Sequence, residues 1–274
     1  MINPRVICSS ITFRRRPLAE ALTLIEEIGF SGFDLGALPG VCDHVPYELT
    51  PSAVAEVAAV VKAAGPATAS INGDIGDLNR VLSDAEQDER DKHLQQLLDL
   101  CIATGSPALV LPCGSLGHQP IRSLAEDLDL VAEQLTRASR AAADRGVVIW
   151  VEELHSGRIC YNTERARQLH DRLTDAGTGV VMDFSHIVAT GHDPVDYIAE
   201  FGEAITHVHV RDAVPGNINV SVGRGQVDFA TGVAELRRIG YAGVFSLELE
   251  THDVAEDERP AAARQAGEYL STLI

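Results

Sequence analysis

The chain has 274 residues, of which 45% are hydrophobic and 23% charged, a composition that suits one large α/β domain or two smaller ones. Its formal net charge of −18 would repel phosphate backbones, so we expect no nucleic-acid partner. There is no apolar run of about 18 residues, and residues 1–12 lack the basic start and long apolar core of a signal peptide. These features predict a cytoplasmic protein without a membrane partner. The five cysteines form no close pairs, which favours reduced thiols over disulfides or a thiolate metal site.

In the first half of the chain, short apolar runs alternate with segments of helical periodicity. Pro17 suits the first turn of a helix, Ser83 and Glu86 match a capping box, and Gly146 is placed to cap a helix carboxyl end. The predicted elements are a strand 6–11, a helix 17–28, a strand 32–35, a helix 51–64, a strand 68–71, a helix 83–104, a strand 108–111 and a helix 123–145.

The second half continues the same alternation. We expect Thr163 to cap the fifth helix, Pro194 to start a short sixth helix and Asp228 to cap the seventh. A long loop at 212–226 separates the seventh strand from the seventh helix. The remaining predicted strands are 147–151, 179–182, 205–210 and 244–247, and the final helix is 259–273.

Eight strand and helix pairs in succession predict a parallel sheet, and eight is the number that closes a barrel. We therefore expect the α/β class and a single (β/α)8 TIM barrel domain over residues 1–274. A doubly wound open sheet is the alternative. No glycine-rich phosphate fingerprint follows the first strand, which counts against that alternative.

Four consecutive strands of the second half end in side chains that can bind a metal. These side chains are Glu153, Asp183, His209 and Glu248, separated by intervals close to one βαβ repeat of roughly 30 residues. Because the carboxyl ends of barrel strands converge on one mouth, we expect the four side chains to surround a common point. With Glu153 facing inward, Glu152 would face the helices.

Three carboxylates and one imidazole are a mostly oxygen ligand set, which suits one divalent ion. Mn²⁺ is the preferred choice, and Mg²⁺, Co²⁺ and Zn²⁺ are alternatives. Period-two alternation places His207 behind His209 and Glu250 at the rim beyond Glu248. The open positions of a six-coordinate ion would accept two substrate oxygens.

The same segments resemble the xylose isomerase-like superfamily of sugar isomerases and epimerases. The resemblance rests on residues 151–157, on Asp183 to His186 followed by residues 191–194, and on residues 207–212, 223–228 and 246–248. It implies a (β/α)8 barrel with one divalent metal on Glu153, Asp183, His209 and Glu248, and with His186 near the substrate.

The chain departs from the ketose 3-epimerases of that superfamily. These carry a glutamate six residues beyond the ligand that corresponds to Glu153, where this chain has Ile159. They also carry an arginine six residues beyond the histidine that corresponds to His209, where this chain has Pro215. Arginines gather in the loops of the predicted barrel mouth, and a phosphate or carboxylate is a ligand that they would bind. The arginines assigned to substrate binding are Arg14, Arg211 and Arg224.

The predicted activity is that of a divalent-metal-dependent isomerase or epimerase acting on a sugar, a sugar phosphate or a related hydroxy-ketone. Glu153 and Glu248 would remove and return a carbon-bound proton through a metal-bound enediolate. The alternative is a metal-dependent dehydratase of a cyclitol ketone or keto acid, since an enediolate also expels a β-hydroxyl. A non-catalytic sugar-binding barrel is a more distant alternative. The expected partner is the small-molecule substrate, and a homo-oligomer is left open.

Overall fold

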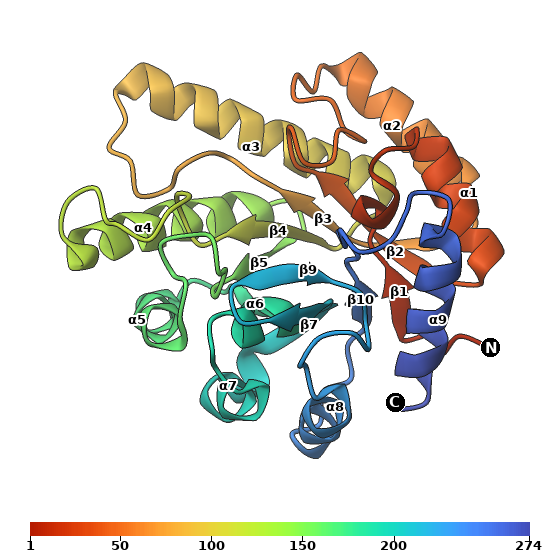
Figure 1. The fold of residues 1–274 in the computed structure, drawn as a ribbon. Coiled ribbons are helices and arrows are strands. Elements are labelled where there is room, and N and C mark those ends of the chain that lie inside the picture. The colour runs from red at the N-terminus through yellow and green to blue at the C-terminus, as the bar shows by residue number, and fades with distance from the viewer.

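The computed structural model describes residues 1–274 as a nearly closed barrel of eight parallel strands with helices outside it (Figure 1). The strands pair in the order β1-β10-β7-β6-β5-β4-β3-β2, and β1 and β2 complete the ring by packing side by side. The barrel strands are β1 (Val6–Cys8), β2 (Gly32–Ala37), β3 (Ala67–Gly73), β4 (Ala108–Pro112), β5 (Val148–Glu152), β6 (Gly179–Asp183), β7 (Ile205–Val210) and β10 (Phe245–Leu247). The predicted (β/α)8 TIM barrel is thereby confirmed.

The helices follow the strands along the chain and, apart from the short α6 beside β7, cover the outer face of the barrel (Figure 1). They are α1 (Leu18–Ile28), α2 (Pro51–Ala63), α3 (Asp84–Thr104), α4 (Leu124–Ala143), α5 (Thr163–Leu173), α6 (Phe184–Ala189), α7 (Pro194–Phe201), α8 (Phe229–Arg238) and α9 (Arg259–Ser271), with 3-10 turns η1 (Ser10–Phe13) and η2 (Gly202–Ala204). None of them combines the length and apolar character needed to cross a membrane.

Local sequence signals account for several helix ends. Ser83 and Ser123 each form a capping box with the glutamate three residues later, which satisfies backbone N–H groups of the first turn of α3 and α4. Asp228 caps α8, as predicted. The predicted cap Thr163 is wrong by one residue, because the Asn162 side chain accepts the hydrogen bond from the Arg165 backbone N–H.

Three short elements differ from the sequence prediction. β1 ends at Cys8 because the chain turns into η1, whose cap is the Ser9 hydroxyl. The additional helix α6 begins directly after β6. The loop predicted at 212–226 contains an antiparallel hairpin of β8 (Asp212–Val214) and β9 (Asn217–Val220).

The loop between the hairpin and α8 is held by the Asp212 carboxylate. This carboxylate accepts hydrogen bonds from the backbone N–H groups of Gly223 (2.8 Å), Gly225 (2.9 Å) and Val227 (3.1 Å). A Cβ atom on Gly225 would lie 2.2 Å from Oδ1 of Asp212, so only glycine allows this close approach. The loop is therefore fixed to the first strand of the hairpin.

Candidate functional site

The barrel mouth holds a cavity of about 530 Å³ at the carboxyl ends of the strands. Its floor is polar and includes Glu152, His186, Arg211 and Glu248. Its outer wall is apolar and comes from the loops after β2 and β4 and from the hairpin; the wall residues are Leu38, Pro39, Val41, Leu116 and Ile218. This arrangement is the usual location of substrate sites in such barrels.

Strand register brings the floor residues together. Asp183 on β6 is directly opposite His209 on β7, and His209 is opposite Ser246 on β10. Glu248 lies two residues beyond Ser246, on the same face of the chain. Nδ1 of His209 is 3.6 Å from Oε1 of Glu152 and 3.7 Å from Oε2 of Glu248.

The expected inward orientation of Glu153 is wrong, and Glu152 occupies the inward position. On β5, Trp150 and Glu152 share a face, and Trp150 stacks on His207 inside the barrel with ring centroids 4.8 Å apart. Glu153 therefore points outward, where its Oε1 lies 3.1 Å from Nδ1 of His170 on α5. Burial raises the pKa of Glu153, and the contact with His170 opposes that increase.

Glu152, Asp183 and His209 place one ligand atom each within 4.8 Å of one another, and Glu248 adds a fourth. Oδ2 of Asp183 and Nδ1 of His209 are buried without a hydrogen-bond partner. Buried polar atoms are seldom left unpaired, so these two atoms favour a cation between them. The donor set of three carboxylates and one imidazole suits a divalent ion.

The Asp183 carboxylate has two separate functions. Oδ1 accepts hydrogen bonds from the backbone N–H groups of Ser185 (2.6 Å) and His186 (3.2 Å) and so caps α6. Oδ2 faces the site and lies 3.6 Å from Nη2 of Arg211. The cap fixes the carboxylate orientation and leaves the second oxygen free for a ligand.

His186 and His155 lie side by side, with ring centroids 4.0 Å apart. Nδ1 of His186 accepts a hydrogen bond from the Ser156 backbone N–H (3.2 Å), and Nδ1 of His155 accepts one from the Gly157 N–H (3.0 Å). Backbone N–H groups only donate, so the network assigns the ring proton of both neutral imidazoles to Nε2. Burial lowers the pKa of each ring to about 3, which keeps both neutral.

Both Nε2 atoms face Glu152, at 3.8 Å from His186 and 4.0 Å from His155. A metal needs the lone pair of this nitrogen, which these tautomers lack. The two rings are therefore hydrogen-bond donors beside the ligand cluster. His186 was predicted to lie near the substrate, but His155 was not predicted as a site residue. The position of His155, three residues after Glu152, indicates a place at the site only when Glu152 is known to face inward.

The predicted arginines have different positions. Arg211 is 1% exposed on the cavity floor and donates to Oε2 of Glu250 (2.8 Å) and to Oγ of Ser185 (3.1 Å). Arg14 pairs with the other oxygen of Glu250 and does not line the cavity. Arg224 lies outside the cavity, with its side chain 64% exposed, and pairs with Asp253.

Electrostatics separate the two inward glutamates. Burial tends to raise the pKa of Glu152, but His186, His209 and His155 outweigh it and lower that pKa. Burial raises the pKa of Glu248 well above its usual value. Glu248 also accepts a hydrogen bond from Nδ2 of Asn72 on β3 (3.2 Å). The two carboxylates approach from β5 and β10, strands separated by β6 and β7.

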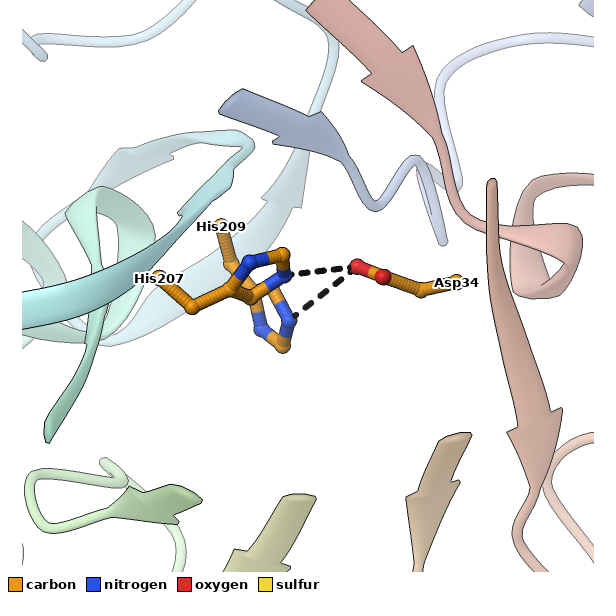
Figure 2. A group of neighbouring side chains, drawn as sticks. All are labelled: Asp34, His207 and His209. Carbon is orange, nitrogen blue, oxygen red and sulfur yellow. Dashed lines mark hydrogen bonds and ion pairs between the residues drawn. The ribbon is translucent and has the colours of Figure 1, made fainter. Parts of the chain in front are cut away.

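Beneath His209, Asp34 and His207 form a second buried cluster (Figure 2). Oδ2 of Asp34 is 2.8 Å from Nε2 of His207 and 3.7 Å from Nε2 of His209. A register shift between Phe33 and Asp34 on β2 accompanies the inward position of Asp34. Asp34 has no recognisable sequence signal, because it is a single acid inside a short strand.

Known proteins with similar sequences include an epimerase and a dehydratase. Over 258 residues, the chain is 22% identical to 3-dehydro-D-guloside 4-epimerase from Escherichia coli, a match that covers 90% of this chain and 93% of that enzyme. It is 26% identical to inosose dehydratase from Clostridium beijerinckii over 110 residues, covering 40% of this chain. That match spans only 36% of the dehydratase.

Solved structures show the same fold. The apo form of 3-keto-D-glucoside 4-epimerase YcjR from E. coli superimposes with a TM-score of 0.78 at 20% identity, covering 98% of this chain and 100% of that one. The IolI protein with a bound zinc atom gives a TM-score of 0.77 at 18% identity, covering 99% and 98%. The sequence profile described as "Xylose isomerase-like TIM barrel" matches residues 22–273, and the chain therefore belongs to this family.

Proposed function

We propose that the protein is a divalent-metal-dependent epimerase or isomerase of an uncharged sugar or related hydroxy-ketone. The observation that carries the proposal is the convergence of Glu152, Asp183, His209 and Glu248 on the floor of the mouth cavity, with Oδ2 of Asp183 and Nδ1 of His209 lacking partners. Mn²⁺ remains our preferred ion for this ligand set, with Mg²⁺, Co²⁺ and Zn²⁺ as alternatives.

A divalent ion held by these four residues would supply Lewis acidity toward the carbonyl and adjacent hydroxyl oxygens of the substrate. Glu152 and Glu248 face the cavity from opposite sides of the ligand cluster. One carboxylate removes the carbon-bound proton, leaving an enediolate, and the other returns a proton to the opposite face. Return to the same carbon gives an epimer, and return to the neighbouring carbon gives an isomer.

The paired imidazoles orient the substrate. The Nε2–H groups of His155 and His186 point toward Glu152 and line the cavity, so they donate hydrogen bonds to substrate oxygens beside the base. Because both rings stay neutral, they add donors without adding charge next to the cation. The apolar wall around Leu38, Val41 and Leu116 excludes water from the reacting end of the substrate.

Charge pairing favours an unphosphorylated substrate. Arg158 donates to Oδ2 of Asp74 at 2.7 Å, and Arg211 donates to Glu250 at 2.8 Å. Each arginine that lines the cavity thus already has a carboxylate partner, and a phosphate would have to compete with it. The neutral hydroxyl groups of a sugar need no unpaired cation and can form hydrogen bonds with the polar groups of the cavity floor.

The test is exchange of a carbon-bound substrate proton with solvent deuterium, followed by NMR in the metal-reconstituted protein. Neutral ketoses, keto-glycosides and cyclitol ketones form one panel, and sugar phosphates form the matched panel. We expect exchange with a member of the neutral panel and none after chelation of the metal. Exchange confined to sugar phosphates would contradict the proposed substrate class.

A dehydratase is the second candidate, favoured by the match to inosose dehydratase and by the two Nε2–H donors, which suit hydrogen bonding to a departing hydroxyl. The proton that turns this hydroxyl into water comes from the carboxylate that removed the carbon-bound proton. Elimination consumes the enediolate by expelling a β-hydroxyl as water, so product analysis in the same assay separates the two reactions. Loss of one water from a cyclitol ketone, without epimer formation, would replace the epimerase assignment.

A further inference from the structure

His209 lies between two groups of carboxylates. Its Nδ1 faces Glu152 and Glu248, and its Nε2 faces Oδ2 of Asp34 at 3.7 Å. The ring is fully buried, and neither nitrogen has a hydrogen-bond partner. The chemistry at Nδ1 therefore depends on what the opposite nitrogen meets.

Two contacts fix the position of the Asp34 carboxylate. Its Oδ1 accepts a hydrogen bond from Oγ of Ser70 on β3 (2.8 Å), and its Oδ2 pairs with Nε2 of His207 (2.8 Å). His207 is itself held by stacking on Trp150. Figure 2 shows both imidazoles directed at the same carboxylate oxygen. This oxygen retains a second lone pair for an N–H donor.

From this geometry we infer that Asp34 is a positioning residue that holds the proton of His209 on Nε2 and so keeps the Nδ1 lone pair directed at the metal. The inference rests on the metal site of the proposed function. An acceptor behind a metal-ligating imidazole fixes its tautomer and ring orientation and increases its strength as a ligand. Asp34 acts through His209, and it does not line the substrate cavity.

The experiment measures the affinity for Zn²⁺ alone, by competition with a chromophoric chelator, in wild type and in Asp34→Asn. Asparagine keeps the size of the side chain but removes the charge, and we expect Zn²⁺ affinity to fall by about 10- to 100-fold. The matched control is Asp228→Asn, an exposed helix cap for which asparagine is equally suitable, and its affinity should equal that of wild type.

A second measurement on the wild type keeps the inference testable even if Asp34→Asn fails to fold. In the Zn²⁺-loaded protein labelled with ¹⁵N-histidine, NMR should show His209 protonated at Nε2, with a slowly exchanging ring proton. A proton on Nδ1, or equal Zn²⁺ affinities in wild type and Asp34→Asn, would overturn the inference. A loss of thermal stability with unchanged affinity would reduce Asp34 to a structural role.

Neither readout needs a substrate, so the two proposals fail in different ways. Tight Zn²⁺ binding that depends on Asp34, without proton exchange on any substrate, would reject the proposed function alone. Proton exchange with equal affinities in the two proteins would reject the role of Asp34 alone. A wild type that binds no divalent ion would reject both.

Discussion

Adjacent glutamates on β5 occupy opposite environments. Glu152 faces the barrel mouth and lies within 4.0 Å of ring nitrogens of His155, His186 and His209. The Glu153 side chain is 1% exposed and pairs with His170 on α5. The same substitution at the two positions therefore separates a role in chemistry from a role in stability.

We predict that Glu152→Gln lowers the rate of substrate proton exchange by about 10²- to 10⁴-fold, because the amide cannot accept the proton. Glu153→Gln should leave this rate nearly unchanged and lower the free energy of unfolding by about 1–3 kcal/mol, since it weakens a buried hydrogen bond. Exchange rates and urea unfolding of the two variants provide the check. The reverse pattern would show that the faces of β5 are assigned wrongly.

The alternation of apolar and polar residues along the strands predicts that Glu152 faces inward. Along β7 and β10, large apolar residues alternate with polar ones. Val208 and Val210 point to the face of β7 away from His209, and Leu247 and Leu249 point to the face of the chain away from Glu248. Applied to β5, the same rule groups Ile149 and Val151 with Glu153 on the helix-facing side. Asp183, His209 and Glu248 face one another in the structure because each ends or lies on the inward face of its strand.

At the scale of elements, the start of α4 anchors two loops of the barrel mouth. The fully buried Asp127 carboxylate accepts hydrogen bonds from Nδ2 of Asn79 (2.9 Å) and from the Ile121 N–H (2.8 Å). Asn79 in turn accepts from the Ser115 N–H (2.9 Å). One carboxylate thus ties the loop after β3 to the loop after β4, and both loops contribute cavity residues.

Burial tends to raise the pKa of Asp127, but the hydrogen bonds from Asn79, Ile121 and Arg122 outweigh it and lower the pKa below its usual value. The stabilisation is therefore present above the unfolded-state pKa of about 3.9 and is lost as pH falls through the lower folded-state pKa. We predict that Asp127→Asn costs about 1–3 kcal/mol of unfolding free energy at pH 7.

The difference between wild type and Asp127→Asn should shrink as the pH falls below about 4, because protonation removes the charge that the variant lacks. Urea unfolding at pH 7 and at several pH values down to 3 measures this convergence. A constant difference across the range would mean that the charge of Asp127 makes no contribution. The exposed Asp193→Asn is the control, since asparagine also caps α7.

Elements with strong local signals were predicted within a few residues, including α3 and α4 with their capping boxes. The β8–β9 hairpin was missed because its strands are only 3 and 4 residues long and its register is irregular. The fixed position of the loop depends on the backbone N–H groups of Gly223, Gly225 and Val227 reaching Asp212, and hydrogen bonds over 11 to 15 residues have no local pattern.

Across the whole molecule, the barrel concentrates carboxylates at one buried point of a chain that already carries a net charge of −18. Glu152, Asp183 and Glu248 are each at most 8% exposed. Arg211 offsets part of their charge, since its Nη2 lies 3.6 Å from Asp183 and 3.8 Å from Glu248. Burial of like charges without full compensation costs folding free energy. A divalent cation at this point offsets that cost in the folded state only.

We therefore predict that divalent metal raises the thermal unfolding midpoint of the wild type. At a free metal concentration of about 100 times the dissociation constant, the gain is about 2.7 kcal/mol, which amounts to a rise of several degrees for a domain of this size. Asp183→Asn should fold but lose the rise, because Oδ1 still caps α6 whereas an amide nitrogen replaces Oδ2. Asp193→Asn, a substitution of another helix cap, should retain it. Equal rises in Asp183→Asn and wild type would place the metal elsewhere in the protein.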